Sequence, residues 1–184
     1  SITDTLKNVE KYFNDPSLVS NSSFFLPYLS GERTPHNDPH IRGSFHAIKT
    51  TTDVTNLQYA VIEGVSFGIL DGVNSILKVN NKFDKIFMVG GGSRSSFWID
   101  LIASLLQRNL SVCDQSEYGA ALGVARLAMH VDNNIKDQND IIKEIKISKE
   151  YQPKIDSIDL LKKRYTIWKD LYTSNKNIAS TLLA

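Results

Sequence analysis

Three consecutive glycines, Gly90 to Gly92, follow an apolar run from Ile86 to Val89 and precede a polar stretch that begins at Ser93. Each glycine costs backbone entropy when the chain folds, so three at one junction need a physical reason. Two reasons are available: a backbone conformation with positive φ, or a very close approach of the backbone to a ligand or another element. The glycines therefore mark the junction at which this chain is most constrained.

The composition is that of an ordinary globular protein and narrows the class of partners. Of the 184 residues, 41% are hydrophobic and 22% are charged, and the formal net charge is +1. Such a small net charge gives no long-range field toward nucleic acid or an anionic membrane, so we expect neither as a partner. The single cysteine, Cys113, fits a reducing compartment, and we expect a cytoplasmic protein. The first residues lack the apolar stretch of a signal peptide, and no run approaches the ~20 apolar residues of a membrane helix.

Hydrophobic periodicity and turn residues divide the chain into alternating helices and strands. Helices are expected at 4–13, 55–79, 95–107, 117–129 and from 155 onward, and strands or extended segments at 24–29, 44–48, 84–89 and 109–114. The stretches 14–23 and 30–43 carry residues typical of loops, whereas 141–147 fits a short strand or a short helix equally well. The alternation predicts an α/β fold, taken as one domain over residues 1–184. The family resemblance described below further implies a mixed sheet with flanking helices.

The helix expected at 55–79 is the clearest element of the chain. Thr55 and Gln58 fit a capping box at its start. Beside its apolar stripe runs a second stripe of small residues, at Ala60, Gly64, Gly68 and Gly72. Because a glycine inside a helix costs about 1 kcal/mol, this stripe predicts a helix or strand packed unusually close to it. A ligand groove along the same face is the alternative.

The glycine turn has three interpretations on spacing alone. A strand that runs into glycines and then a helix is the general nucleotide-binding arrangement of α/β proteins, because exposed backbone N–H groups lie beside a positive helix end. A Walker A loop is excluded because no lysine follows the glycines. Gly90, Gly92 and Ser95 nearly satisfy the dinucleotide fingerprint, and Asp114 ends the next strand where a ribose-binding acid would stand. The third interpretation is a tight crossing without a ligand.

Other chemically suggestive residues have structural explanations. His36, Asp38 and His40 match no established metal-ligand framework, and Asn-Asp-Pro favours a turn, so no metal site is expected. Cys113 is expected to be a small core residue. The basic segment "LKKRY" at 161–165 is expected on the solvated face of the terminal helix.

Two acids of the helix at 55–79 also need an interpretation. Glu63 and Asp71 share one face of the helix but lie about 12 Å apart along its axis. That separation is too large for a paired-carboxylate site. Both are expected to be solvated or to form salt bridges.

Several segments in order resemble one protein family. They are "LPYLSGERTPHNDP" followed by "RGSF", then "EGVSFGILDGVNSI", "MVGGGSRSSFWIDLIASLLQ" and "EYGAALGVARLAM". Together they are similar to the C-terminal domain of the xylulose kinases, within the sugar kinases that have the actin-like, ribonuclease-H-like ATPase fold. The resemblance extends from about Phe24 to Met129. Gluconate and ribulose kinases share much of the pattern.

The resemblance implies a role for the glycine turn as an adenosine motif. Gly91, Gly92 and Ser93 would approach the nucleotide through their backbone, and Ser96 stands where relatives often have an asparagine on the adenine side. In the loop at 30–43, Glu32 and Arg33 would shape the cleft or touch phosphate. The alternative for Arg33 is an ion pair with Glu32 or another acid. The implied ligands are ATP or ADP and Mg²⁺, the metal being held mainly by phosphates and by parts outside this chain.

The same resemblance implies a two-domain enzyme of which this chain supplies the C-terminal nucleotide-binding part. The parent reaction would convert D-xylulose and ATP to D-xylulose 5-phosphate and ADP. The N-terminal domain with most sugar contacts, the catalytic aspartate and the Gly-Thr phosphate loop have no counterpart here, so no catalytic residue is assigned and the chain alone is expected to be inactive.

Two other classes of function stay open at this point. The first is a non-catalytic module that binds a nucleotide or a partner chain, with exposed apolar area that drives homo-oligomer formation. The second is a fragment of a Rossmann-type oxidoreductase, which would prefer NAD over ADP.

Overall fold

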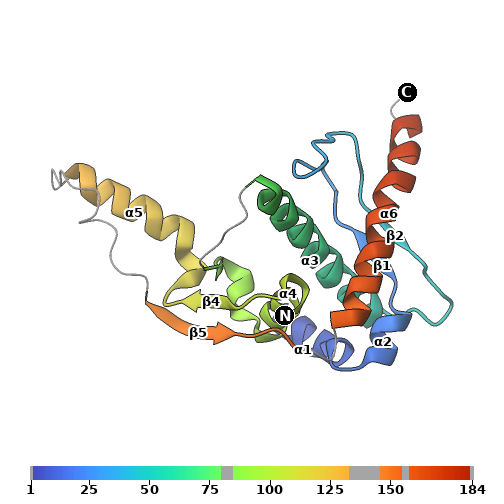
Figure 1. The fold of residues 1–184 in the computed structure, drawn as a ribbon, viewed down its shortest axis with the longest axis horizontal. Helices are drawn as coiled ribbons and strands as arrows, with labels where there is room; N and C mark the ends of the chain where they lie inside the picture. Colours follow the sequence, from blue (N-terminus) through green and yellow to red (C-terminus); the bar gives the residue numbers. More distant parts are fainter. Residues whose placement is uncertain (1, 80–84, 133–145, 155–157, 183–184) are drawn as a thin grey trace.

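The computed structural model describes residues 2–79, 85–132, 146–154 and 158–182 as an α/β protein (Figure 1). The helices are α1 (Ile2–Phe13), α2 (Pro16–Asn21), α3 (Val54–Val79), α4 (Ser96–Leu106), α5 (Gly119–Asp132) and α6 (Ile158–Leu182), with short 3₁₀ turns η1 (Gly91–Arg94) and η2 (Ser116–Tyr118). The strands are β1 (Phe24–Leu26), β2 (Ser44–His46), β3 (Phe87–Met88), β4 (Leu110–Cys113) and β5 (Ile147–Tyr151). The α/β class expected from the sequence is confirmed.

The strands form two separate sheets. In the larger one the order is β3-β4-β5, with β4 parallel to β3 and antiparallel to β5. The smaller one pairs β1 with β2 antiparallel, with Phe25 opposite Phe45. The expectation of a mixed sheet is therefore confirmed. In Figure 1, α3 crosses the middle of the molecule, α6 and the small sheet lie on one side of it, and the larger sheet and α5 lie on the other.

Helix α3 organises the packing. Its small-residue stripe is explained at Gly64, where an added Cβ would lie 2.1 Å from the Phe25 carbonyl oxygen. A Cβ added at Gly68 would have Pro27 Cγ as its nearest neighbour, at 3.8 Å. A Cβ added at Gly72 would meet no described atom within 4 Å outside the nearby backbone of α3. The predicted close approach of a strand is thus confirmed for Gly64, where β1 packs on α3.

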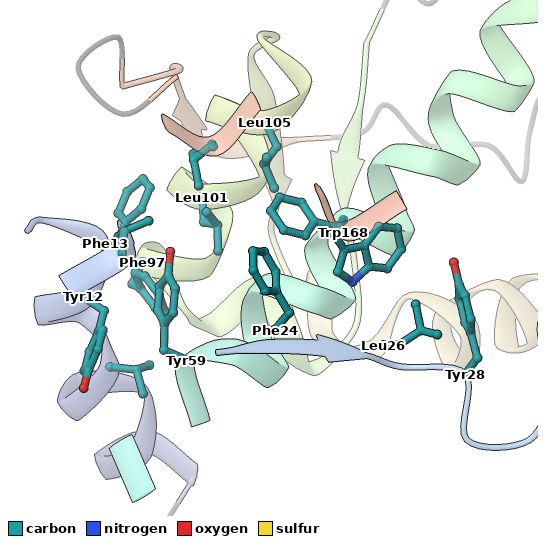
Figure 2. Close-up of a cluster of buried hydrophobic side chains, with 14 of the residues drawn as sticks. Tyr12, Phe13, Phe24, Leu26, Tyr28, Tyr59, Phe97, Leu101, Leu105 and Trp168 are labelled. Carbon is teal, nitrogen blue, oxygen red and sulfur yellow. The ribbon is translucent and has the colours of Figure 1, made fainter. Parts of the chain in front are cut away.

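Most of the core lies where α1, α3, α4, α6 and β1 meet. Figure 2 shows aromatic side chains from four of these elements converging there: Tyr12 and Phe13 from α1, Tyr59 from α3, Phe97 from α4 and Trp168 from α6. A smaller cluster packs α4 on the larger sheet through Ile99, Ile102, Ala103, Leu110 and Tyr151. Because α4 belongs to both clusters, the helix that follows the glycine turn is held firmly on two sides.

Several local expectations are wrong for identifiable reasons. The stretch expected as a loop at 14–23 contains α2, because the Asp15 carboxylate accepts hydrogen bonds from the Ser17 and Leu18 N–H groups. Helix α3 is capped by Asp53, whose Oδ1 accepts from the Asn56 N–H at 2.7 Å, and not by the box at Thr55. The stretch 141–147 falls outside the described residues except for its end, where β5 begins.

Two expectations about burial also need correction. Arg164, within the segment expected to be solvated, is buried in the core. Cys113 is only partly buried and lines a cavity beside Asp114. Neither outcome could be read from local periodicity, because both depend on elements distant in sequence.

By length and composition α3 could cross a membrane, which the sequence had not led us to expect. Among the described helices it alone passes that test, with a mean hydropathy of 1.4 in its most apolar part. Its Glu63 and Asp71 lie inside the protein, paired with residues of α6, and its faces pack on β1, α1 and α4. Core helices of globular proteins can have the same composition, and 33% of the most apolar part of α3 is buried inside the protein.

Candidate functional site

The glycine turn leaves β3 and enters α4 through η1. Gly90 has φ +84°, a conformation that residues with a side chain rarely adopt. Its N–H donates to the Ser116 carbonyl at 2.8 Å, and its carbonyl accepts from the Ser93 N–H at 3.1 Å. Positive φ therefore explains the first glycine.

The other two glycines differ from Gly90 and from each other. A Cβ on Gly92 would lie 3.0 Å from the Trp98 ring, so packing against the indole favours glycine there. At Gly91 the φ angle is not positive, and an added Cβ would meet no described atom within 4 Å. Neither of these structural reasons accounts for Gly91, which faces open space.

That open space is a cavity of about 470 Å³. One side is the turn and the start of α4, and the other side is α1 with one residue of α3. The lining residues are Leu6, Lys7, Glu10, Ile62, Gly91, Gly92, Arg94, Ser95, Ser96, Phe97 and Trp98. Apolar walls are thus combined with hydroxyl groups and backbone N–H groups at the positive end of a helix dipole.

Hydrogen bonds fix the walls of this cavity. The Ser95 hydroxyl accepts from the Trp98 N–H at 3.2 Å and so caps α4. The Trp98 indole N–H donates to Ser66 Oγ at 2.9 Å, which holds the ring against α3. Ser96 Oγ lies 3.0 Å from the Tyr151 hydroxyl of β5. The cavity is therefore largely formed without a ligand.

The predicted nucleotide-contacting residues do not all face the cavity. Gly91, Gly92 and Ser96 line it. Ser93 is buried, and its hydroxyl donates to the Gly90 carbonyl at 2.7 Å and accepts from Ser116 Oγ at 2.8 Å. Ser93 thus lies behind the turn, where it fixes the turn's shape.

The structure does not bring Glu32 and Arg33 to this cavity. Glu32 Oε2 accepts from the His36 N–H at 2.8 Å, and Arg33 is exposed. Across the part of the chain that the structure describes, no ion pair joins Arg33 to an acid. The loop instead lies against the second half of α3 and against α6, since the His36 ring stacks on Tyr172 at 3.6 Å and approaches Asp71.

Cavity residues from α1 and α3 were missed by the sequence reasoning. In the sequence, Leu6 lies on the apolar face of an ordinary amphipathic helix. Lys7 and Glu10 lie on the polar face of the same helix, which is expected to contact solvent. Ile62 lay within the helix expected at 55–79 but in neither of its two stripes. No local signal distinguishes these positions, because the cavity forms only when α1 packs beside the turn.

A second cavity of about 450 Å³ lies on the other side of the turn, between the sheet and α5. It is lined by Val89, Ser116, Asp114 and Arg126, among others. Asp114, the candidate ribose-binding acid of the dinucleotide hypothesis, faces this cavity and pairs with Lys146 at 3.7 Å. It therefore lies on a different side of the turn from Gly91.

Comparison with known families assigns the chain to one of them. Residues 4–131 match the C-terminal domain of the FGGY family of carbohydrate kinases. The chain belongs to this family. The actin-like ATPase fold of its structural neighbours replaces the dinucleotide-binding hypothesis.

Individual relatives agree with the family assignment. The chain is 30% identical over 165 residues to a xylulose kinase from Staphylococcus epidermidis, an alignment that covers 89% of this chain and 33% of that protein. A crystal structure of a xyloylose kinase from Brucella ovis superposes with a TM-score of 0.74 at 30% identity, over 96% of this chain and 38% of that one. A gluconate kinase from Lactobacillus acidophilus gives a TM-score of 0.74 at 25% identity, over 95% and 34%. The chain spans about a third of the length of the curated relatives it matches.

Proposed function

We propose that this chain is the nucleotide-binding part of an ATP-dependent sugar kinase and that adenine nucleotide binds in the cavity in front of Gly91. The whole enzyme would transfer the γ-phosphoryl group of ATP to a sugar hydroxyl, with D-xylulose as the sugar. Mg²⁺ would be held mainly by the phosphates. The observation that carries the proposal is Gly91, which has no conformational or steric requirement within the described structure and opens onto the cavity.

The chemistry of the cavity supports a nucleotide. Leu6, Ile62 and Trp98 offer apolar surface of the kind that a purine base covers. Gly91 and Gly92 leave the backbone accessible, and the N-terminus of α4 favours negative charge. Ser93 is assigned a positioning role behind the turn, and Ser96 is assigned to the ligand side.

The sugar is proposed from the relatives. The similarity to xylulose kinases supports D-xylulose as the sugar. Gluconate is an alternative because a gluconate kinase from Lactobacillus acidophilus is also similar. Ribulose is a further alternative because its kinases share much of the same sequence pattern. No catalytic base is assigned in this chain. We therefore propose that the chain alone does not phosphorylate D-xylulose, and turnover by a clean preparation would contradict this. Glu32 and Arg33 keep a proposed role at the cleft, and the cytoplasmic location stays a prediction.

Thermal unfolding with added nucleotide tests the site directly. A ligand that binds only the folded chain stabilises it by RT ln(1 + [L]/Kd), about 2.7 kcal/mol at 100 times Kd. ADP and ATP should raise the melting temperature and NAD should not. Gly91→Leu should fold normally, because nothing described occupies the space that it enters, but should lose the response by filling the cavity.

Gly72→Leu is the matched control, since a Cβ at Gly72 also meets no described atom within 4 Å and Gly72 does not line the cavity. It should keep the full response to ADP. No response in the unmodified chain, or an unchanged response in Gly91→Leu, would contradict the proposed site. A response to NAD alone would favour the oxidoreductase alternative, and a response to no nucleotide would favour a partner-binding module.

A further inference from the structure

The indole of Trp98 forms one wall of the cavity at Gly91, and two hydrogen bonds hold this residue in place. The Trp98 backbone N–H donates to Ser95 Oγ at 3.2 Å, which fixes the start of α4. The indole N–H donates to Ser66 Oγ of α3 at 2.9 Å. Ser66 lies 32 residues earlier in the chain and is only 1% exposed, so the second bond joins two elements inside the protein.

The Ser66 hydroxyl is oriented by a hydrogen bond of its own. It donates its proton to the Ile62 carbonyl, one helical turn earlier, at 2.7 Å. A hydroxyl has one proton and two lone pairs, so the oxygen stays free to accept the indole N–H. Both bonds therefore exist together, and Ser66 acts toward Trp98 only as an acceptor.

The other edge of the indole lies against the glycine turn. A Cβ added at Gly92 would lie 3.0 Å from Cζ3 and 3.2 Å from Cε3 of Trp98, so the six-membered part of the ring packs on this glycine. The indole thus lies between Ser66 of α3 and the turn in front of which the nucleotide is proposed to bind. Rotation of this ring would narrow the cavity and remove a support of the turn.

Without Ser66 the indole N–H would need another acceptor, because a buried N–H without one is destabilising. The side chains of Leu6, Ile62 and Phe97, which line the cavity, have no acceptor atom. The Glu10 carboxylate on α1, across the cavity, has one, as does solvent. These acceptors would draw the indole into the cavity, where it would occupy the space proposed for the base.

From these contacts we infer that Ser66 is a positioning residue for the adenine nucleotide. It holds the Trp98 indole against α3 and Gly92, so that the cavity stays open and keeps an aromatic wall for the base. The inference rests on the proposed function, because the nucleotide is the ligand that this wall would contact. Ser66 does not itself line the cavity, so its effect passes through Trp98. If the indole is in the binding orientation only part of the time, the affinity falls by that fraction.

Isothermal titration with ADP measures the effect, under conditions in which circular dichroism shows each variant to be folded. Ser66→Ala should raise the Kd for ADP about tenfold, the size expected when one buried hydrogen bond that holds the wall is lost. In the Trp98→Phe background the same substitution should change the Kd less than about twofold, because phenylalanine keeps an aromatic ring and needs no acceptor.

Ser75→Ala is the matched control. Ser75 lies on the same helix and also donates to the carbonyl four residues earlier, that of Asp71, at 3.0 Å, but it lies outside the cavity. Its substitution should leave the Kd for ADP unchanged.

A second readout needs no ligand. Hydrogen exchange of the Trp98 indole N–H can be followed by NMR, with its signal assigned by its loss in Trp98→Phe. Exchange should be about tenfold faster or more in Ser66→Ala than in the unmodified chain, because the hydrogen bond that protects the proton is gone. Ser75→Ala should leave the exchange rate unchanged.

An unchanged Kd or an unchanged exchange rate in Ser66→Ala would overturn the inference. An equal loss of affinity in the Trp98→Phe background would also overturn it, since Ser66 would then act without the indole. A protected indole N–H in an unmodified chain that binds no ADP would instead contradict the proposed function, and the hydrogen bond would then have a structural role only. The two failures are therefore distinguishable.

Discussion

The guanidinium of Arg164 on α6 binds the carboxylate of Glu63 on α3 inside the core, with Nε–Oε1 at 2.7 Å and Nη2–Oε2 at 2.6 Å. Both side chains are almost fully buried, at 4% and 1% exposure. Arg164 also donates to the carbonyls of Ser22 and Ser23, each at 3.1 Å. One side chain therefore joins α6, α3 and the segment that leads into β1.

The charges of this pair depend on each other. Burial raises the pKa of Glu63, and the neighbouring Arg164 opposes that shift. Burial alone would lower the pKa of Arg164, but Glu63 outweighs it and holds the pKa above its ordinary value. Removing one partner thus leaves the other as an unpaired charge in a dry environment.

We predict that Arg164→Ala lowers the free energy of unfolding by about 3–5 kcal/mol, because it strands the buried Glu63 carboxylate. Urea unfolding measures this loss. Lys163→Ala, at the exposed neighbouring position, should change stability by less than about 0.5 kcal/mol. The double variant Glu63→Met with Arg164→Met should be more stable than Arg164→Ala, and a double variant that is less stable would contradict the reason given.

Two glycines of α3 should respond to alanine with opposite signs. Gly64→Ala places a Cβ 2.1 Å from the Phe25 carbonyl oxygen, so it should destabilise the protein by about 1–3 kcal/mol or more through overpacking. The Cβ of Gly72→Ala meets no described atom within 4 Å, so this variant should be more stable by about 0.5–1 kcal/mol through helix propensity. Thermal and urea unfolding of both variants check the pair. Equal effects would show that β1 does not approach α3 at Gly64.

The hydroxyl groups of Ser93 and Ser116, behind the glycine turn, should contribute to stability in a coupled way. Ser93→Ala removes the acceptor of the buried Ser116 hydroxyl and should cost about 1–3 kcal/mol of stability. Adding Ser116→Ala removes that unsatisfied donor, so the double variant should lose less than the sum of the single variants. A double-mutant cycle in urea measures this coupling, and strictly additive losses would contradict it.

Stability should depend on pH through Asp38 in the loop at 30–43. Hydrogen bonds from the His40 N–H, from Tyr172 and from the Ile41 N–H hold the Asp38 pKa below its ordinary value of 3.8. A carboxyl whose pKa is lower in the folded state adds stability above the unfolded pKa and loses it as the pH falls through the folded pKa. The advantage of the unmodified chain over Asp38→Asn in urea unfolding should thus be present at neutral pH and shrink below about pH 4. A pH-independent difference would contradict this.

Much of the fold could be predicted because its signals are local. Apolar periodicity located α1, α3 and α4, and short apolar runs located β1 and β4 to within a few residues. Local signals gave a wrong prediction where a helix signal and a loop signal coincide. Asp15 caps α2, but the residues around it are ones that also favour loops. Local signals also failed at Arg164, where a basic run on an amphipathic helix resembled a solvated face.

For the candidate site, the sequence by itself determined that a strand, three glycines and a helix follow one another, since turn and capping chemistry operates within about four residues. Only the tertiary structure gave each of the three glycines its own explanation. Gly90 has positive φ, Gly92 packs on Trp98, and Gly91 faces open space. The tertiary structure alone placed Leu6 and Ile62 across the cavity and turned the Ser93 hydroxyl away from it. These positions depend on which distant segments pack together, and that follows from the burial of apolar surface by the whole chain rather than from neighbouring residues.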